Sequence, residues 1–285
     1  MFYENYIEKI YIVNGLARSG NHLFITWLIS GFNNNEVYYL NNIKPSYYNL
    51  INEKKTNIKK IFNYHTITND NKYGLKINEE IRKNLVGTKD MKKFLFGKKK
   101  IKILVISMEN KKTEKIDILS KIFTNCDNIY KCIVLRDILN LFSSRIESEK
   151  RLSSEDLYKT DKITIEYWLD NYYNSKKKDY TVFNYNKFLC YAITRKALSN
   201  KLNINYSKTK ITLNSFGLTS GSSFQNNISN KSDYFMRWNL FKNNELVKNL
   251  INQKNIMKIL CRDFSMCLNF DDKKIKICKN LYNLE

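Results

Sequence analysis

Proline, glycine and cysteine are scarce in this chain of 285 residues, and each scarcity narrows the class of protein. One proline and eight glycines argue against long disordered linkers. The six cysteines form no C-x-x-C pair, so we expect no zinc or other metal site. We interpret them as free thiols in a reducing compartment.

Long apolar runs are also missing. No stretch approaches the ~20 apolar residues that a membrane-spanning helix needs. The first ten residues mix Glu4, Glu8 and Lys9 with aromatics, and they lack the apolar core of a signal peptide. We therefore expect a soluble protein that is cytoplasmic or otherwise intracellular.

Acidic residues are few compared with basic ones, since 27 Asp and Glu stand against 49 Lys and Arg. The formal net charge of +22 favours an anionic partner, and nucleic acid, acidic glycans, a membrane surface and nucleotide cofactors all fit. The lysines are scattered, as in 98–100, 176–178 and 273–274, so a solvated basic surface explains the charge equally well. Nucleic-acid binding would need clustered basic residues with exposed aromatics, so no stable nucleic-acid complex is expected.

The apolar content is high enough for one sizeable core, because 43% of the residues are hydrophobic and 14% are aromatic. We expect a single domain over 1–285, in which strand-like apolar runs alternate with segments of helical spacing. The expected strands are Lys9–Asn14, Lys59–His65, Ile101–Ser107, Tyr130–Leu135 and Thr181–Asn184. The expected helices are 22–32, 114–123, 139–150, 164–175, 189–202 and 245–261.

This alternation predicts an α/β fold with a mostly parallel central sheet flanked by helices. Ligands of such sheets lie beyond the carboxyl ends of the strands, so the residues after each strand are the candidates for chemistry. Segment 64–100 is polar and basic with weak periodicity, and we interpret it as an insertion or a substrate-facing segment.

Gly15 and Gly20 have the G-x-x-x-x-G spacing of a phosphate loop, between the first expected strand and the first expected helix. Such a loop turns successive N–H groups toward an anion, and the helix adds its positive end. A nucleotide triphosphatase would continue with Lys and then Ser or Thr, where this chain has Asn21 and His22. The loop can therefore hold a phosphate without the usual magnesium ligand, and its cation is Arg18. An ordinary strand-to-helix turn is the alternative.

These residues resemble the phosphosulfate loop of the sulfotransferases that use 3′-phosphoadenosine 5′-phosphosulfate (PAPS). That loop reads approximately (Lys/Arg)-Ser-Gly-(Thr/Asn)-(Thr/His), and Arg18-Ser19-Gly20-Asn21-His22 matches it. The RSGNH form is similar to a branch of sulfotransferase-like proteins rather than to the best-known cytosolic enzymes, which have Lys-Ser-Gly-Thr-Thr. The resemblance implies a P-loop-type sheet, PAPS as co-substrate, and cofactor contacts from Arg18, Ser19, Gly20, Asn21, His22 and Leu23.

In that family an Arg at a strand end and a Ser eight positions later hold the 3′-phosphate, and Arg136 and Ser144 fit this spacing. A guanidinium offers a fork that matches phosphate oxygens. The alternative for Arg136 is a salt bridge to Asp137 or to a surface acid. A weaker resemblance adds Ser223 and Phe224 as contacts of the adenine and the 3′-phosphate. The family's later Arg-Lys-Gly triplet is missing from this chain, and Arg237 is the candidate substitute at a shorter spacing. A polar loop explains that region equally well.

Sulfuryl transfer needs a base for the acceptor's proton. Glu109 follows the clearest expected strand and is the first candidate, and His65 follows an expected strand and is the second. Glu36 is the third, because Asn35-Glu36-Val37 resembles the segment with the catalytic Glu of heparan-type members. Each can instead be an ordinary solvated side chain.

The sequence thus predicts a PAPS-dependent sulfotransferase that modifies a hydroxyl or amine of a glycan, protein, lipid or small molecule. A P-loop nucleotide or nucleoside kinase is the first alternative, and the missing Gly-Lys-Ser/Thr counts against it. A basic nucleic-acid-binding protein is the second.

Overall fold

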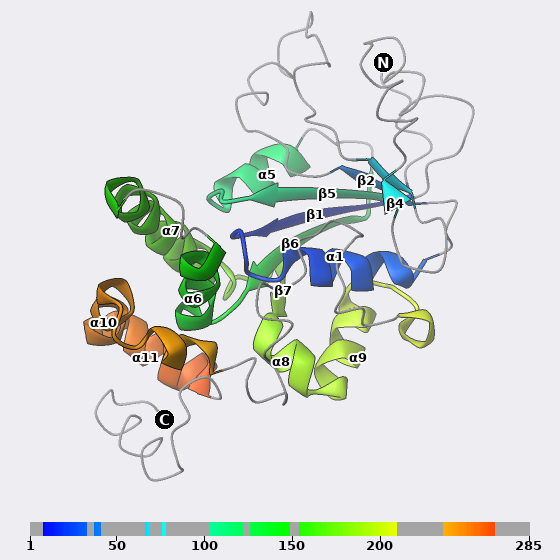
Figure 1. The fold of residues 1–285 in the computed structure, drawn as a ribbon. Helices are drawn as coiled ribbons and strands as arrows, with labels where there is room; N and C mark the ends of the chain where they lie inside the picture. The colour runs from blue at the N-terminus through cyan, green and yellow to red at the C-terminus, as the bar shows by residue number, and fades with distance from the viewer. Residues whose placement is uncertain are drawn as a thin grey trace, which may run out of the picture.

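The computed structural model describes residues 8–32, 37–40, 66–68, 76–77, 103–121, 126–148, 154–209 and 236–265. Within them lies one seven-stranded sheet of order β4-β3-β2-β5-β1-β6-β7 (Figure 1). The strands are β1 (Lys9–Gly15), β2 (Val37–Leu40), β3 (Thr66–Thr68), β4 (Lys76–Ile77), β5 (Ile103–Glu109), β6 (Ile129–Leu135) and β7 (Tyr180–Asn184). The α-helices are α1 (Asn21–Ser30), α5 (Glu114–Ser120), α6 (Ile138–Ser148), α7 (Ser154–Asn174), α8 (Tyr185–Cys190), α9 (Ala192–Lys201), α10 (Glu245–Asn252) and α11 (Lys254–Asp263). Two short 3-10 helices are η4 (Tyr206–Lys208) and η7 (Arg237–Phe241).

The sheet is mostly parallel. Strands β2, β5, β1, β6 and β7 run parallel to one another, and β3 and β4 add antiparallel pairs at the β2 edge. The prediction of an α/β fold with a mostly parallel sheet flanked by helices is therefore confirmed. Strands β3 and β4 belong to segment 64–100, which was not expected to pair with the sheet, whereas the expected strand Lys59–His65 lies outside the described residues.

Strand β1 is buried on both faces, as expected for the centre of a parallel sheet. Ile10 and Ile12 point into a core built with α5, α6, α7, α10 and α11. Tyr11 and Val13 point into the opposite core, built with α1, α8 and α9. Figure 1 shows α5 on one side of the sheet and α1, α8 and α9 on the other. Each fully buried aliphatic side chain stabilises the folded state by about 1.5–3 kcal/mol relative to an exposed one. Burial on both faces therefore holds β1 firmly at the centre of the sheet.

Three predicted helices differ from the observed ones. Helix α7 begins at Ser154, well before the expected start at Thr164. The segment expected as one helix over 189–202 divides at Tyr191, and that over 245–261 divides at Gln253, because both residues have extended backbone. Neither break involves Gly or Pro, so the usual signals of a helix end were absent. No helix in the described ranges has the length and apolar character needed to cross a membrane.

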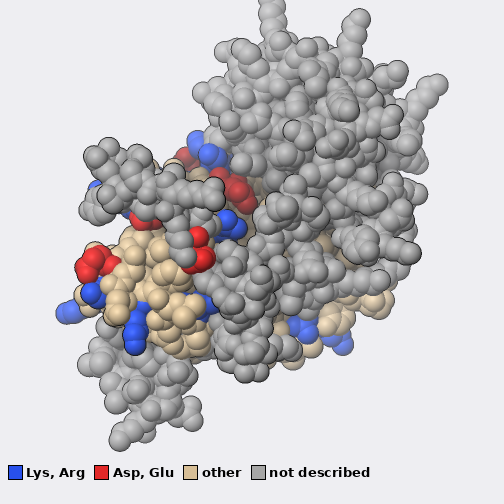
Figure 2. Space-filling view, viewed as in Figure 1, with Lys and Arg blue, Asp and Glu red and all other residues tan. Residues whose placement is uncertain are grey.

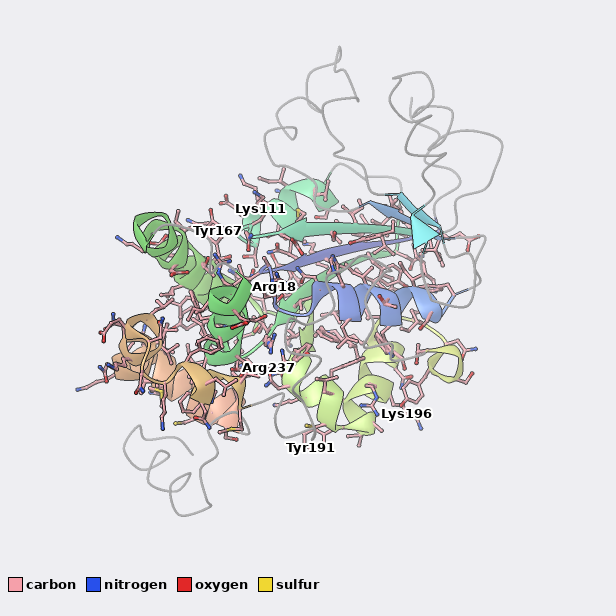
Figure 3. All side chains as sticks on the ribbon, viewed as in Figure 1. Arg18, Lys111, Tyr167, Tyr191, Lys196 and Arg237 are labelled. Carbon is pink, nitrogen blue, oxygen red and sulfur yellow. The ribbon has the colours of Figure 1, made fainter. Side chains whose placement is uncertain are left out.

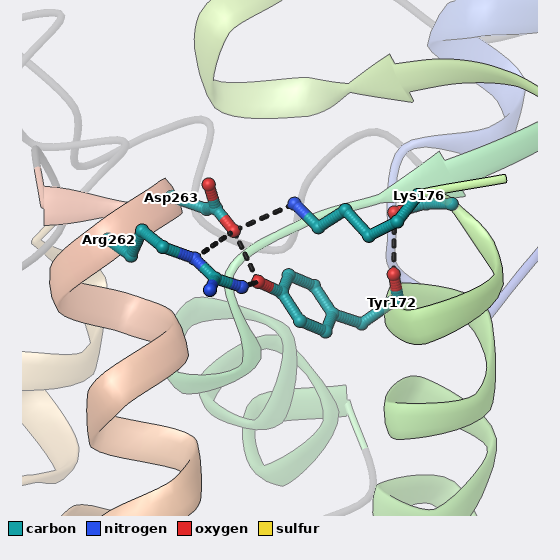
Figure 4. A network of polar contacts seen from close by, with 5 residues as sticks. Tyr172, Lys176, Arg262 and Asp263 are labelled. Carbon is teal, nitrogen blue, oxygen red and sulfur yellow. Dashed lines mark hydrogen bonds and ion pairs between the residues drawn. The ribbon is translucent and has the colours of Figure 1, made fainter. Parts of the chain in front are cut away.

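A polar network joins α7 to α11 (Figure 4). The Tyr172 hydroxyl donates to Asp263 and accepts from Arg262, and Lys176 Nζ lies 2.9 Å from Asp263 Oδ2. Burial raises the pKa of Tyr172 to about 12, and its hydrogen bond to Asp263 adds to the rise. Burial alone would raise the pKa of Asp263, but the hydrogen bonds from Tyr172 and Lys176 and the nearby cations bring it below its ordinary value. Acidic and basic side chains are interleaved over the α10 and α11 region of the surface (Figure 2).

Candidate functional site

The loop between β1 and α1 is tightly curled. Ser19 N donates to Leu16 O over 3.0 Å, and Phe24 N donates to Gly20 O over 3.1 Å as α1 begins. Arg18 and Gly20 have φ values of 73° and 100°, so the backbone visits the left-handed region twice within three residues. Such alternation directs neighbouring N–H groups toward one point, and the first amides of α1 have no acceptor within the helix. The segment predicted to bind phosphate thus has a backbone suited to an anion.

Both glycines of this loop are required by close contacts. A Cβ on Gly15 would lie 2.0 Å from Asn21 Oδ1 and 2.8 Å from Val134 Cβ. A Cβ on Gly20 would lie 2.3 Å from Cδ2 of Tyr185, the first residue of α8. The glycine spacing read from the sequence therefore has a packing cause at each end of the loop.

The side chains of Ser19 and Asn21 are directed into the loop itself. Ser19 Oγ donates to Asn21 Oδ1 over 3.1 Å. Asn21 Nδ2 donates to Leu16 O over 3.3 Å and to Glu109 Oε1 over 3.2 Å. Both residues are buried, so their polar groups shape the loop and leave the backbone amides to meet an anion. His22 and Leu23 follow on the first turn of α1 and are half-buried.

Glu109 stands beside this loop. It is the last residue of β5, it is half-buried, and the strand register places it opposite Gly15. On its other side, β2 contributes Tyr39, whose hydroxyl lies 2.9 Å from Ser107 Oγ. Burial raises the pKa of Tyr39, and the negative charge of Glu109 adds to that rise. Of the three predicted bases, Glu109 is the one that the structure describes next to the loop, whereas Glu36 and His65 lie outside the described residues.

Asn110 connects β5 to the loop, and it was not among the predicted site residues. Its backbone N donates to Gly15 O over 3.1 Å, and its Oδ1 accepts from Ala17 N over 2.9 Å. The φ of Asn110 is 54°, a conformation that Asn tolerates better than most residues. An Asn directly after the clearest strand was the available signal, but the pairing of β5 with β1 was needed to interpret it.

Arg136 lies just beyond the carboxyl end of β6, the other neighbour of β1. Its side chain is only 4% exposed, and Nη1 donates to Arg18 O over 3.0 Å. Its guanidinium lies over the Tyr185 ring, 4.8 Å from the centroid. The remaining donors, Nε and Nη2, are buried and have no hydrogen-bond partner among the described residues. Burying charged donors without an acceptor is costly, so an anion bound at this place would remove the penalty.

Arg136 and Asp137 form no salt bridge in the described part of the chain, so this alternative is not observed. The Asp137 carboxylate accepts from Asn140 N over 2.8 Å and from Asn186 Nδ2 over 3.0 Å. Asp137 thereby caps the start of α6, while the Arg136 carbonyl accepts from Trp168 Nε1 over 2.8 Å. The backbone of Arg136 is thus held in place from α7, and its side chain is directed to the loop.

The sheet topology explains why these residues meet. The chain leaving β1 crosses toward β2, and the chain leaving β6 crosses toward β7, in opposite directions from two adjacent strands. Such a divergence opens a crevice at the carboxyl ends of the two strands, where open α/β sheets bind ligands. Arg18, Lys111 and Arg237 lie around this end of the sheet in Figure 3.

The remaining predicted contacts are partly placed. Ser144 is buried on α6, and Arg237 is buried at the start of η7. The two elements are joined by a hydrogen bond from Trp238 N of η7 to Asn140 Oδ1 of α6. Ser223 and Phe224 lie outside the described residues. Tyr185, which contacts both Gly20 and Arg136, was not predicted, because only the packing of α8 against the loop identifies it.

No protein-family model matches this chain, and no curated protein matches it either. We therefore infer its function from the contacts of the site.

Proposed function

We propose that this protein is a sulfotransferase that moves a sulfuryl group from PAPS to a hydroxyl or amine acceptor. The observation that carries the proposal is the side chain of Arg136. It is anchored to the Gly15–Gly20 loop through Arg18 O, while Nε and Nη2 remain buried and unmatched in the described part of the chain. An anionic nucleotide with two charged ends would use the loop amides for one end and Arg136 for the other.

The residues present fit such a nucleotide. The loop and the start of α1 offer backbone amides suited to the 5′-phosphosulfate. Arg136, with Ser144 and Arg237 on the neighbouring elements, would hold the 3′-phosphate, since a guanidinium fork matches phosphate oxygens. The loop has Asn21 and His22 in place of the Lys and Ser or Thr that a kinase uses for its triphosphate and Mg²⁺, so the fit to a sulfuryl donor is better.

Glu109 is the proposed base. Asn21 Nδ2 donates to Glu109 Oε1 over 3.2 Å, and no described residue donates to Glu109 Oε2. Glu109 Oε2 would accept the proton from the acceptor hydroxyl or amine. The acceptor atom then forms a bond to sulfur as the bond between sulfur and the bridging phosphate oxygen breaks. PAPS supplies the sulfuryl group, and adenosine 3′,5′-bisphosphate is the leaving product. The loop amides would stabilise the negative charge that develops on the bridging oxygen.

Thermal unfolding with three ligands in parallel tests the proposal. Adenosine 3′,5′-bisphosphate at about 100 times its Kd should raise the unfolding midpoint by roughly 5 °C without added metal. ATP with Mg²⁺ and a single-stranded oligonucleotide should each have little effect. Stabilisation by ATP with Mg²⁺ alone would favour a kinase, and stabilisation by the oligonucleotide alone would favour a nucleic-acid-binding protein.

A further inference from the structure

Two large apolar residues that are close in sequence are exposed at the junction of α8 and α9. Ile193 is 78% exposed and Tyr191 is 49% exposed. Single exposed apolar residues are common, but neighbouring ones at a helix junction are not explained by packing. The other large exposed apolar residues of the described chain lie on α5, α7 and η7: Ile118, Ile163, Tyr173 and Leu240.

The same stretch of sequence carries positive charge and no acidic residue. On α9, Lys196 lies one turn after Ile193, so these two side chains share a helix side. Lys187 lies close to Tyr191 in the chain, and Tyr191 N donates to Lys187 O over 2.9 Å. Both lysines are exposed, and neither makes an ion pair with a described residue. The sequence contains no Asp or Glu between Asp179 and Asp233. By contrast, Ile118 and Ile163 each have acidic neighbours within three residues.

We propose that this surface, formed by Lys187, Tyr191, Ile193 and Lys196 and named here the α8–α9 corner, docks onto an anionic lipid surface. Tyr191 and Lys196 both lie at the outer edge of the molecule, away from the sheet (Figure 3). A projecting aliphatic side chain can enter the acyl boundary, Tyr can occupy the headgroup level, and the flanking lysines can meet anionic headgroups.

The composition of the corner favours a lipid surface over other anions. Nucleic acid binds to stacking aromatics in a basic groove, whereas Ile193, the most exposed residue of the corner, has no ring to stack on a base. Arg195, which could have contributed to a polyanion site, is used internally, because its Nη1 donates to Phe188 O over 2.6 Å. Tyr191, Ile193 and Lys196 follow the last residue of α8, and none of the four corner residues belongs to the proposed nucleotide site.

Flotation of the full chain with vesicles tests the inference. The protein should float with vesicles of phosphatidylcholine mixed with phosphatidylserine and not with phosphatidylcholine alone. Ile193→Ser should weaken the partition roughly tenfold. Lys187→Gln and Lys196→Gln should each weaken it about fivefold. Unchanged thermal midpoints would show that these exposed substitutions leave the fold intact.

Two matched variants separate the corner from the general basic charge of the chain. Leu240 is 74% exposed on η7 and Lys258 is exposed on α11, so Leu240→Ser and Lys258→Gln remove similar groups elsewhere. Both should leave the partition unchanged. Equal losses from the control variants, or equal flotation with neutral vesicles, would overturn the proposal. Retention on polyglutamate or an oligonucleotide without any flotation would also overturn it, and would assign the corner to an acidic macromolecule.

Discussion

Replacing Gly20 with alanine should destabilise the protein for two separable reasons. Gly20 has a φ of 100° and a ψ of 21°, and a non-glycine residue in the left-handed region costs about 1–2 kcal/mol. The added Cβ would also lie 2.3 Å from Tyr185 Cδ2, whereas ordinary contact begins at about 3.4 Å, so the ring must move by about 1 Å. Forced movement in a packed region costs about 1–3 kcal/mol, which gives a total of about 2–5 kcal/mol.

Urea unfolding measures this loss, and a second glycine gives the control. Gly31 has a φ of −76°, and a Cβ there would meet Thr209 Cγ2 at 3.2 Å, so Gly31→Ala should cost much less than Gly20→Ala. In a Tyr185→Ala background, Gly20→Ala should cost only the backbone part of about 1–2 kcal/mol, because the steric conflict is gone. A Gly20→Ala loss no larger than that of Gly31→Ala would refute the role assigned to Tyr185.

Four further predictions concern the chemistry and the stability. Sulfuryl transfer should survive EDTA, because the loop lacks the Lys and Ser or Thr that bind a triphosphate and Mg²⁺; activity that returns only with Mg²⁺ would favour a kinase. Glu109→Gln should lower turnover by about 10²–10⁴-fold with donor affinity unchanged. If this variant has normal turnover and either His65→Asn or Glu36→Gln is inactive, the base is the residue replaced in the inactive variant. Tyr172→Phe should lower the free energy of unfolding by about 1–2 kcal/mol at neutral pH in urea titrations. The pKa of Asp263 is lowered from 3.8 in the folded state, so its carboxylate stabilises the fold above that pH, and this contribution is lost as the pH falls through the folded pKa. Asp263→Asn should therefore make the free energy of unfolding depend less on pH in the acid range. An unchanged pH dependence in that range would contradict this.

The elements predicted best are those whose apolar runs are continuous. Strand β5 was expected over Ile101–Ser107 and forms over Ile103–Glu109, because burial on both faces demands nearly uninterrupted aliphatic residues. Strand β2 was missed, since Val37–Leu40 is too short to stand out from its polar surroundings. The breaks at Tyr191 and Gln253 were missed because no Gly or Pro marks them in the sequence.

The candidate site was predictable where its residues are close in sequence. The glycine spacing located the Gly15–Gly20 loop, and the strand end located Arg136. The roles of Asn110 and Tyr185 depend on strand register and on the packing of α8, and neither is encoded in a short motif. The inward orientation of Ser19 and Asn21 was also hidden, because the family resemblance names residues without saying which atoms turn toward the loop.

The measurement that tests the central claim most directly is a calorimetric titration of wild type and Arg136→Met with two nucleotides. Adenosine 3′,5′-bisphosphate should bind the wild type without metal, and the variant should lose about 1.5–3 kcal/mol of binding free energy, the scale of a charged hydrogen bond. Adenosine 5′-phosphosulfate, which has no 3′-phosphate, should bind both proteins about equally. The variant should remain folded, since it removes the buried Nε and Nη2 donors that no described residue satisfies. Failure of the wild type to bind either nucleotide, or an equal loss for both in Arg136→Met, would contradict a PAPS site between the loop and Arg136.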